Sequence, residues 1–237
     1  MRKKLIPVSS PLITTSDAQN VYKVVKSGWV SSSGKEIIKF EKKLAKFVNR
    51  KFACSVSSGT AALEIAVKSL NLKENDEVIM PAFTIISNAI AIIKNEAKPV
   101  LIDTDIKTWN IKIQDIEKKI TKKTKAIMPV HLTGKSCKMD EIIKISKRFD
   151  IPIIEDAAQA IGTKFKNKFV GTFGELGCFS AHPLKNLNAI GDAGYLVTNN
   201  KRYYEKAILL RNHGMKNRNT IKFFGHVSRM DNFQASV

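Results

Sequence analysis

The sequence has little of what marks a secreted, zinc-binding or membrane-spanning protein. Its 237 residues include only three cysteines, Cys54, Cys137 and Cys178, and no two of them form a CxxC spacing. This scatter argues against a disulfide framework and against a metal site, and it fits a reducing, cytoplasmic compartment. The longest apolar stretch, residues 79–93, is interrupted by Pro81 and by polar side chains. No membrane span is therefore predicted.

The sequence also shows no signal-peptide pattern and has few acidic residues. The first residues are basic, but no sustained apolar region or small-residue cleavage site follows them, so a signal peptide is not predicted. The 21 acidic residues stand against 40 Lys and Arg, which gives a net charge of +19. Such a charge by itself favours an anionic partner. The lysines, however, are spread over most expected helices and form no single tract interleaved with aromatics. Solvated helix faces therefore explain the charge, and nucleic acid is not the predicted partner.

Helical and apolar strand patterns alternate along the chain without an internal repeat or a low-complexity linker. Helices are expected over 36–48, 60–70, 87–94, 114–120, 139–149 and 201–211. Strands are expected over 77–80, 99–102, 126–130 and 151–155, with two more on either side of Lys185. Continuous apolar strands separated by helices predict an α/β fold, a mostly parallel sheet with helices on both faces. Ligands bind such sheets beyond the carboxyl ends of the strands.

The most informative stretch is residues 177–194, in which Lys185 lies between two glycine- and proline-bounded turns. A lone loop lysine is by default a solvated surface residue. Here Ser180 and His182 precede it, and an apolar strand leads into the loop, so we expect the amine to be partly desolvated. Desolvation lowers the pKa of an amine, and a neutral amine can form a Schiff base with a carbonyl. The pattern favours a covalent lysine for a carbonyl substrate or for pyridoxal phosphate.

A second candidate is residues 57–63, SSGTAAL, which lie between an apolar segment and an expected helix. Small residues let the backbone approach a ligand, and a helix N-terminus offers free amides and the positive end of its dipole, which suits phosphate. A serine or threonine that simply caps the helix explains the same residues equally well.

Two aspartates, Asp103 and Asp156, end apolar strands, and either could cap the following turn. Asp156 is the better site candidate because the small residues of 157–160 leave room for a flat ligand. A carboxylate there could pair with a protonated pyridine nitrogen and keep the ring electron-withdrawing.

These segments resemble a known family. Residues 179–194, FSAHPLKNLNAIGDAG, are similar to the FSxHPxKNLxAxGDGG pattern of the DegT/DnrJ/EryC1/StrS aminotransferases, pyridoxal-phosphate enzymes that aminate keto groups on nucleotide-linked sugars. The resemblance extends from about residue 28 to the last residue and implies an aspartate-aminotransferase-like large domain of fold type I. It implies that Lys185 forms the internal aldimine and that Asp156 pairs with the pyridine nitrogen. It also implies that Gln159 lies near the ring hydroxyl, and that the phosphate is held by Ser58, Gly59, Thr60 and Ser180.

The family also has an aromatic residue after the threonine of its PxxTF segment, which stacks on the cofactor ring. Ile85 occupies that position here, so apolar contact is retained while π stacking is lost, unless Phe83 compensates. Another departure is Val227, where the family usually has an asparagine that reaches the cofactor phosphate of a neighbouring subunit. This puts that intersubunit contact in doubt.

Four residues are predicted to face the substrate. His131 lies in PVHLTG, which resembles PVHLYG of the family, although a lone histidine is more often structural. His182 is the better candidate for substrate contact or proton relay. Trp29 belongs to a loop similar to the SGW segment at the substrate mouth, and Arg229 belongs to SRMDNFQA, which resembles NxRMxxxQAA.

The resemblance divides the chain into an N-terminal arm and substrate-mouth loop, residues 1–34, and a pyridoxal-phosphate-binding large domain, residues 35–237. The family continues into a small C-terminal domain, so we expect the chain to be truncated. Such a chain should bind the cofactor poorly and turn over sugar substrates little or not at all.

The implied activity is the transfer of an amino group, with glutamate as donor, to a nucleotide-diphospho keto sugar. The resemblance also implies a homodimer and a place in amino-sugar and surface-polysaccharide biosynthesis. The GDAG after Lys185 is closer to the 3-keto branch than to the 4-keto branch. Two alternatives remain: amination of a cyclitol ketone, and a non-catalytic basic binding protein.

Overall fold

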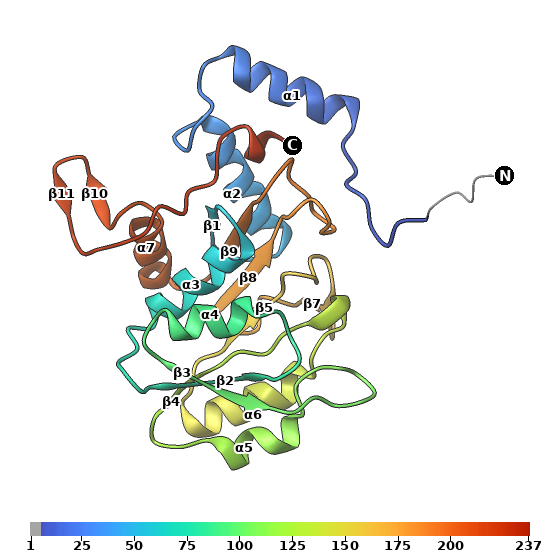
Figure 1. The fold of residues 1–237 in the computed structure, drawn as a ribbon, viewed down its shortest axis with the longest axis vertical. Coiled ribbons are helices and arrows are strands. Elements are labelled where there is room, and N and C mark those ends of the chain that lie inside the picture. The colour runs from blue at the N-terminus through green and yellow to red at the C-terminus, as the bar shows by residue number, and fades with distance from the viewer. Residues whose placement is uncertain (1–5) are drawn as a thin grey trace.

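The structure, a computed structural model, describes residues 6–237, and a twisted sheet runs through its centre (Figure 1). The sheet has the strand order β3-β2-β4-β5-β8-β9-β1. Isolated parallel bridges, Ile127 to Ile153 and Val130 to Asp156, join its three-stranded part to its four-stranded part. The strands are β1 (Phe52–Val56), β2 (Glu77–Pro81), β3 (Lys98–Ile102), β4 (Thr124–Ile127), β5 (Ile154–Asp156), β8 (Leu176–Ser180) and β9 (Gly194–Thr198).

All strands of this sheet run in one direction except β9, which is antiparallel to both of its neighbours, β1 and β8. The predicted mostly parallel sheet is therefore confirmed. One consequence is that the carboxyl ends of the six other strands meet at the same edge. The loop that carries Lys185 joins β8 to β9 and leaves the sheet at this edge as well.

Helices cover both faces, as the alternation of apolar patterns predicts. On one face lie α3 (Gly59–Ser69), α4 (Ser87–Ile93) and α7 (Lys201–Leu210), and on the other lie α2 (Lys35–Phe47), α5 (Ile116–Lys119) and α6 (Met139–Phe149). Strand β2 shows why: Val78 and Met80 pack in the core of the first face, while Ile79 between them packs in the core of the second. Successive side chains of a strand point to opposite faces, so an unbroken apolar run supplies both cores.

Several elements were not predicted. Helix α1 (Thr15–Lys26) lies within residues 1–34, for which only an arm and a loop were expected. Its N-terminus is a capping box, in which Thr14 Oγ1 accepts the Asp17 N–H at 3.3 Å and Asp17 Oδ2 accepts the Thr14 N–H at 2.8 Å. The short elements also missed are β6 (Lys164–Phe165), β7 (Lys168–Phe169), β10 (Met215–Asn217), β11 (Thr220–Ile221) and the 3₁₀ turns η1 (Ile113–Asp115), η2 (Leu132–Gly134) and η3 (Gln234–Ser236). Within residues 6–237, no helix combines the length and apolar character that crossing a bilayer requires.

Candidate active site

A cavity of about 360 Å³ lies at the carboxyl edge of the sheet, where the loops after β1, β2, β4, β5 and β8 converge. This is the place that the topology of a mostly parallel sheet predicts. Ten predicted site residues line it: Ser58, Gly59, Thr60, Ile85, His131, Asp156, Gln159, Ser180, His182 and Lys185. The structure thus brings together residues that the sequence distributes over more than half of the chain.

One end of the cavity is the N-terminus of α3. Ser58 is its N-cap, and Ser58 Oγ accepts the Ala61 N–H at 3.0 Å. The N–H groups of Gly59 and Thr60 lie in the first helical turn, where no intrahelical acceptor is available. A Cβ on Gly59 would stand 2.8 Å from Ser180 Cβ, so glycine is what allows the lysine-loop serine to lie against this backbone. Ser58 therefore caps the helix, while the amides of Gly59 and Thr60 remain available for an anion. The two interpretations of residues 57–63, a helix cap and a phosphate site, are compatible.

Asp156 lies at the end of β5 with only 2% of its surface exposed. Its Oδ2 accepts a hydrogen bond from Asn88 Nδ2 at 2.8 Å, and its Oδ1 accepts the Ala158 N–H at 2.9 Å. Burial raises the pKa of this carboxyl above its usual range, while the two hydrogen bonds and the nearby Lys185 ammonium oppose the rise. A buried carboxylate at a cavity wall favours a cationic partner, such as a protonated ring nitrogen. Asn88 was not predicted to belong to the site, because in the sequence it is only one of the polar residues that interrupt the apolar stretch 79–93.

Lys185 is half-buried and lines the same cavity as Asp156. Its loop is held by backbone hydrogen bonds from the Lys185 N–H to His182 O at 2.8 Å and from the Ala189 N–H to Ala181 O at 2.9 Å. The Ala181 N–H in turn donates to Ala193 O at 2.8 Å, which closes the base of the loop. The amine is therefore carried by an ordered turn between two adjacent strands, as the pattern of small residues and proline predicts.

The two predicted histidines differ in their surroundings. His131 is completely buried: its Nε2 lies 3.0 Å from Glu155 Oε2, and its Nδ1 accepts the Cys137 N–H at 3.2 Å. An Nδ1 that accepts places the proton on Nε2, so both ring nitrogens are used inside the protein. His182 is half-buried, and its Nδ1 accepts the Leu184 N–H at 3.2 Å. Among the hydrogen bonds of residues 6–237, none involves His182 Nε2, and a role of this atom in proton transfer stays a prediction.

The middle of the cavity is lined by an amide and an aliphatic side chain. Gln159 Oε1 accepts the Thr133 N–H at 2.6 Å, which fixes the position of this side chain. Ile85 lines the cavity and is 56% exposed. Phe83 is not part of the lining and packs edge-on against Trp109, with ring centroids 6.3 Å apart. Ile85 is therefore one of the apolar side chains of the cavity, and no Phe, Tyr or Trp among the described residues lines it.

Two predicted substrate residues lie outside this cavity. Trp29 lines a separate and larger cleft of about 820 Å³ between α1, α2 and the C-terminal residues. Arg229 donates from Nη1 to Asn212 Oδ1 at 2.8 Å. The side chain of Val227, at the position of the family asparagine, is 61% exposed. The roles of Trp29 and Arg229 toward a substrate remain predictions.

The comparison with known proteins agrees with this geometry. Residues 11–237 match the DegT/DnrJ/EryC1/StrS aminotransferase family, and the chain belongs to it. It is 42% identical over 212 residues to the GDP-perosamine synthase of Escherichia coli O157:H7, an alignment that covers 90% of this chain and 58% of that protein. It is 41% identical over 219 residues to the dTDP-3-amino-3,6-dideoxy-alpha-D-galactopyranose transaminase of Aneurinibacillus thermoaerophilus, covering 92% and 60% of the two chains.

Among solved structures, NtdA from Bacillus subtilis with bound cofactor PMP superposes with a TM-score of 0.89 at 31% identity. That alignment covers 100% of this chain and 56% of the other. The likeness confirms the predicted aminotransferase fold. The chain spans somewhat more than half of the length of each of these three proteins.

Proposed function

We propose that this chain binds pyridoxal phosphate and takes part in the transfer of an amino group to a keto group of a nucleotide-diphospho sugar. One observation carries the proposal: Lys185, Asp156 and the N-terminus of α3 line one cavity of about 360 Å³. An amine, a buried carboxylate and a set of anion-binding amides are the three groups that a phosphorylated pyridine aldehyde requires. The family provides the reaction class.

The residues present fit the cofactor. The amides of Gly59 and Thr60, with the Ser180 hydroxyl, would hold its phosphate, because backbone N–H groups at a helix N-terminus favour anions. Asp156 would face the ring nitrogen, Gln159 would lie near the ring hydroxyl, and Ile85 would cover one ring face. When bound, pyridoxal phosphate supplies an electron sink for the carbon that bears the amino group.

The protein's own contribution is positioning and proton transfer. The Lys185 amine would hold the cofactor carbonyl and would serve as the base that moves a proton between neighbouring carbons. The Asp156 carboxylate would keep a proton on the ring nitrogen by charge pairing. His182 Nε2 would exchange a proton at the cavity, whereas His131 is hydrogen-bonded to Glu155 and would order the wall.

The substrate class is inferred from the relatives. The names of two of them specify GDP-linked and dTDP-linked sugars, so a nucleotide-diphospho keto sugar is proposed for this chain, with glutamate as amino donor. A cytoplasmic homodimer that serves polysaccharide biosynthesis completes the proposal.

The test begins with the purified chain titrated with pyridoxal phosphate, with visible absorbance reporting covalent attachment. The loaded protein is then incubated with glutamate and a panel of nucleotide-linked 3-keto and 4-keto sugars, and mass spectrometry detects the aminated product. Covalent cofactor binding followed by amination of one panel member supports the proposal. Amination of a cyclitol ketone alone would replace the substrate class, and failure to attach the cofactor even at a large excess of pyridoxal phosphate would overturn the activity.

A further inference from the structure

Three loops, two of which border the cavity at the sheet edge, are each hydrogen-bonded to one distant segment, residues 228–236, which we call the C-terminal clasp. The first contact reaches the phosphate end. Ser228 is buried, its carbonyl oxygen accepts the Ser57 N–H at 2.9 Å, and its own N–H donates to Arg211 O at 3.0 Å. Because Ser57 directly precedes Ser58, the clasp fixes the backbone from which α3 begins.

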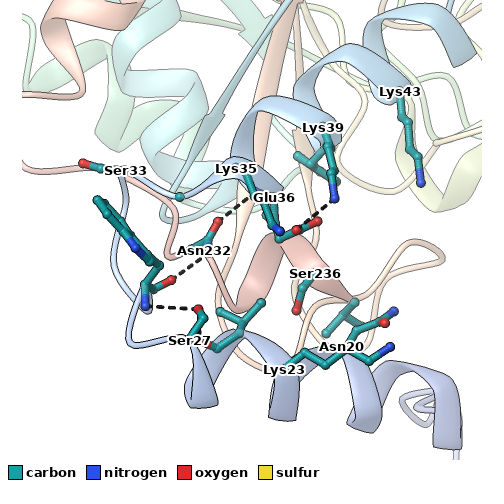
Figure 2. Close-up of a pocket in the computed structure, with 16 residues that line it drawn as sticks. Asn20, Lys23, Ser27, Ser33, Lys35, Glu36, Lys39, Lys43, Asn232 and Ser236 are labelled. Atoms are coloured by element: carbon teal, nitrogen blue, oxygen red, sulfur yellow. Dashed lines mark hydrogen bonds and ion pairs between the residues drawn. The ribbon is translucent and has the colours of Figure 1, made fainter.

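The second contact reaches the loop at residues 28–34. Asn232 is 2% exposed, and its Oδ1 accepts the Glu36 N–H at 3.0 Å while its Nδ2 donates to Trp29 O at 2.7 Å (Figure 2). A Cβ on Gly34 would stand 1.9 Å from Asn232 Cγ. Glycine at position 34 is thus what allows the asparagine to fill this place, between the loop and the first turn of α2.

The third contact reaches the lysine loop itself. Gln234 Oε1 accepts the Ile190 N–H at 3.0 Å, and a Cβ on Gly191 would stand 2.6 Å from Gln234 Nε2. Two other contacts tie this loop to distant residues, from Ser9 Oγ to Leu184 O at 3.3 Å and from Asn188 Nδ2 to Leu12 O at 3.4 Å. Both are longer, and their partners belong to an exposed N-terminal arm. Gln234, in contrast, belongs to a segment anchored by the buried Ser228 and Asn232.

We propose that the C-terminal clasp holds the lysine loop in the position that covalent cofactor binding needs, with Gln234 as the positioning residue. The side chain does not line the cavity, so its effect on Lys185 passes through the backbone of Ile190 and Gly191. This inference depends on the proposed function, because it assigns Gln234 a role in the attachment of pyridoxal phosphate to Lys185.

The test compares two variants of similar shape in the cofactor-free chain. Gln234→Met keeps the length of the side chain and removes the acceptor oxygen, whereas Gln234→Glu keeps an acceptor at the same place. A lost hydrogen bond lets the loop open more often, so hydrogen exchange of the peptide that contains Ile190 should be about 3- to 10-fold faster in Gln234→Met and close to wild type in Gln234→Glu. Gln114→Met, at an exposed glutamine, and Ser9→Ala are the matched controls, and thermal melting confirms that each variant is folded.

The second readout is the rate at which pyridoxal phosphate labels Lys185, trapped with borohydride and read by peptide mapping. The expected result is several-fold slower labelling in Gln234→Met, with recovery in Gln234→Glu and no change in the controls. Unchanged exchange, unchanged labelling, or equal losses in the two Gln234 variants would overturn the positioning role. No labelling of Lys185 in the wild-type chain would instead overturn the proposed function and, with it, this role for Gln234, whatever the exchange data show.

Discussion

Of two hollows within residues 6–237, the smaller one is lined by ten of the predicted site residues and the larger one by Trp29 alone among them. The cleft between α1, α2 and the C-terminal residues measures about 820 Å³, and the cavity at the sheet edge about 360 Å³. Four lysines line the larger one, Lys23, Lys35, Lys39 and Lys43, and Figure 2 shows them arranged along α1 and α2. The smaller one brings together one lysine, a buried aspartate and a helix N-terminus from the ends of β8, β5 and β1. The position of a hollow at the carboxyl ends of the strands, and not its volume, therefore decides which one contains the candidate site residues.

The lysines themselves show the same contrast. Lys39 pairs with Glu36 at 3.0 Å across an exposed helix face, and such surface pairs contribute little to stability. Lys185 belongs to a cavity with a nearly fully buried carboxylate, Asp156, in its wall. Residue type and net charge are therefore poor guides to which of many lysines is reactive, whereas position at a strand end is a good one.

The largest expected effect distinguishes these two lysine environments directly. Lys185→Ala should abolish borohydride-trapped attachment of pyridoxal phosphate, because the nucleophile is gone. Lys43→Ala in the larger cleft should leave labelling unchanged. Peptide mapping of the trapped protein provides the measurement. A label that survives in Lys185→Ala, on any other lysine, would remove the distinction between the two hollows.

The next largest effect concerns the carboxylate. Asp156→Asn should slow the first half-reaction with the amino donor, because a neutral amide does not keep the ring nitrogen protonated. An opposite charge at this range shifts a pKa by about 1–3 units, which corresponds to a loss of about 10- to 1000-fold. Stopped-flow absorbance of the loaded protein measures the rate. Asp103→Asn, at the end of β3, is the matched control, and a larger loss there would reassign the ring partner.

In the larger cleft, the expected effect is on stability instead of chemistry. Gly34→Ala places a methyl group against Asn232, and overpacking of this kind costs about 1–3 kcal/mol. The melting temperature should therefore fall by several degrees, whereas Ser33→Ala should leave it nearly unchanged. Covalent labelling of Lys185 at a temperature where both variants are folded should persist. Complete loss of labelling in folded Gly34→Ala protein would contradict this expectation, because Asn232 anchors the C-terminal clasp but does not line the cavity at the sheet edge.

The smallest effect uses the cofactor-free chain and its pH dependence. Burial raises the folded-state pKa of Asp156 above the ordinary value of 3.8, so the folded chain binds this proton more tightly than the unfolded chain does. The free energy of unfolding then decreases as the pH rises from 3.8 through the folded-state pKa. Asp156→Asn removes this term and should flatten that part of the stability–pH curve, raising the melting temperature at neutral pH by a few degrees at most. Identical stability–pH curves for the wild-type chain and Asp156→Asn would show that burial of the charged Asp156 carboxylate does not destabilise the folded chain.

Some of these features could be predicted from local sequence and others could not. Strands such as β2 and helices such as α6 were expected because their apolar periodicity is strong within one element. The site residues were expected because ligands bind where strands end and because the motifs around Lys185 and Ser58 are dense in small residues. Helix α1 was missed although Thr14 and Asp17 carried a capping signal, since its larger apolar residues are confined to 21–25.

What could not be predicted depends on contacts between distant segments. The Asn88 bond to Asp156 and the Glu155 bond to His131 join residues whose local sequence gives no reason for pairing. The same holds for the antiparallel direction of β9, because a short apolar run carries no signal for the direction in which it pairs. The clasp contacts of Ser228, Asn232 and Gln234 are of this kind as well. Sequence patterns thus indicated the candidate site residues, and only the fold showed which contacts support them.

The place of β1 at the edge of the sheet has a consequence for how the molecule is made. Within residues 6–237, its one sheet neighbour is β9, which the ribosome adds long after β1. Until then β1 lacks a pairing partner, and the turn at Ser58 that follows it lacks its contact with Ser228. Contacts between such distant segments slow folding and leave strand edges open to association. We therefore expect the anion-binding turn, among the first parts of the site to be synthesised, to be among the last to become ordered.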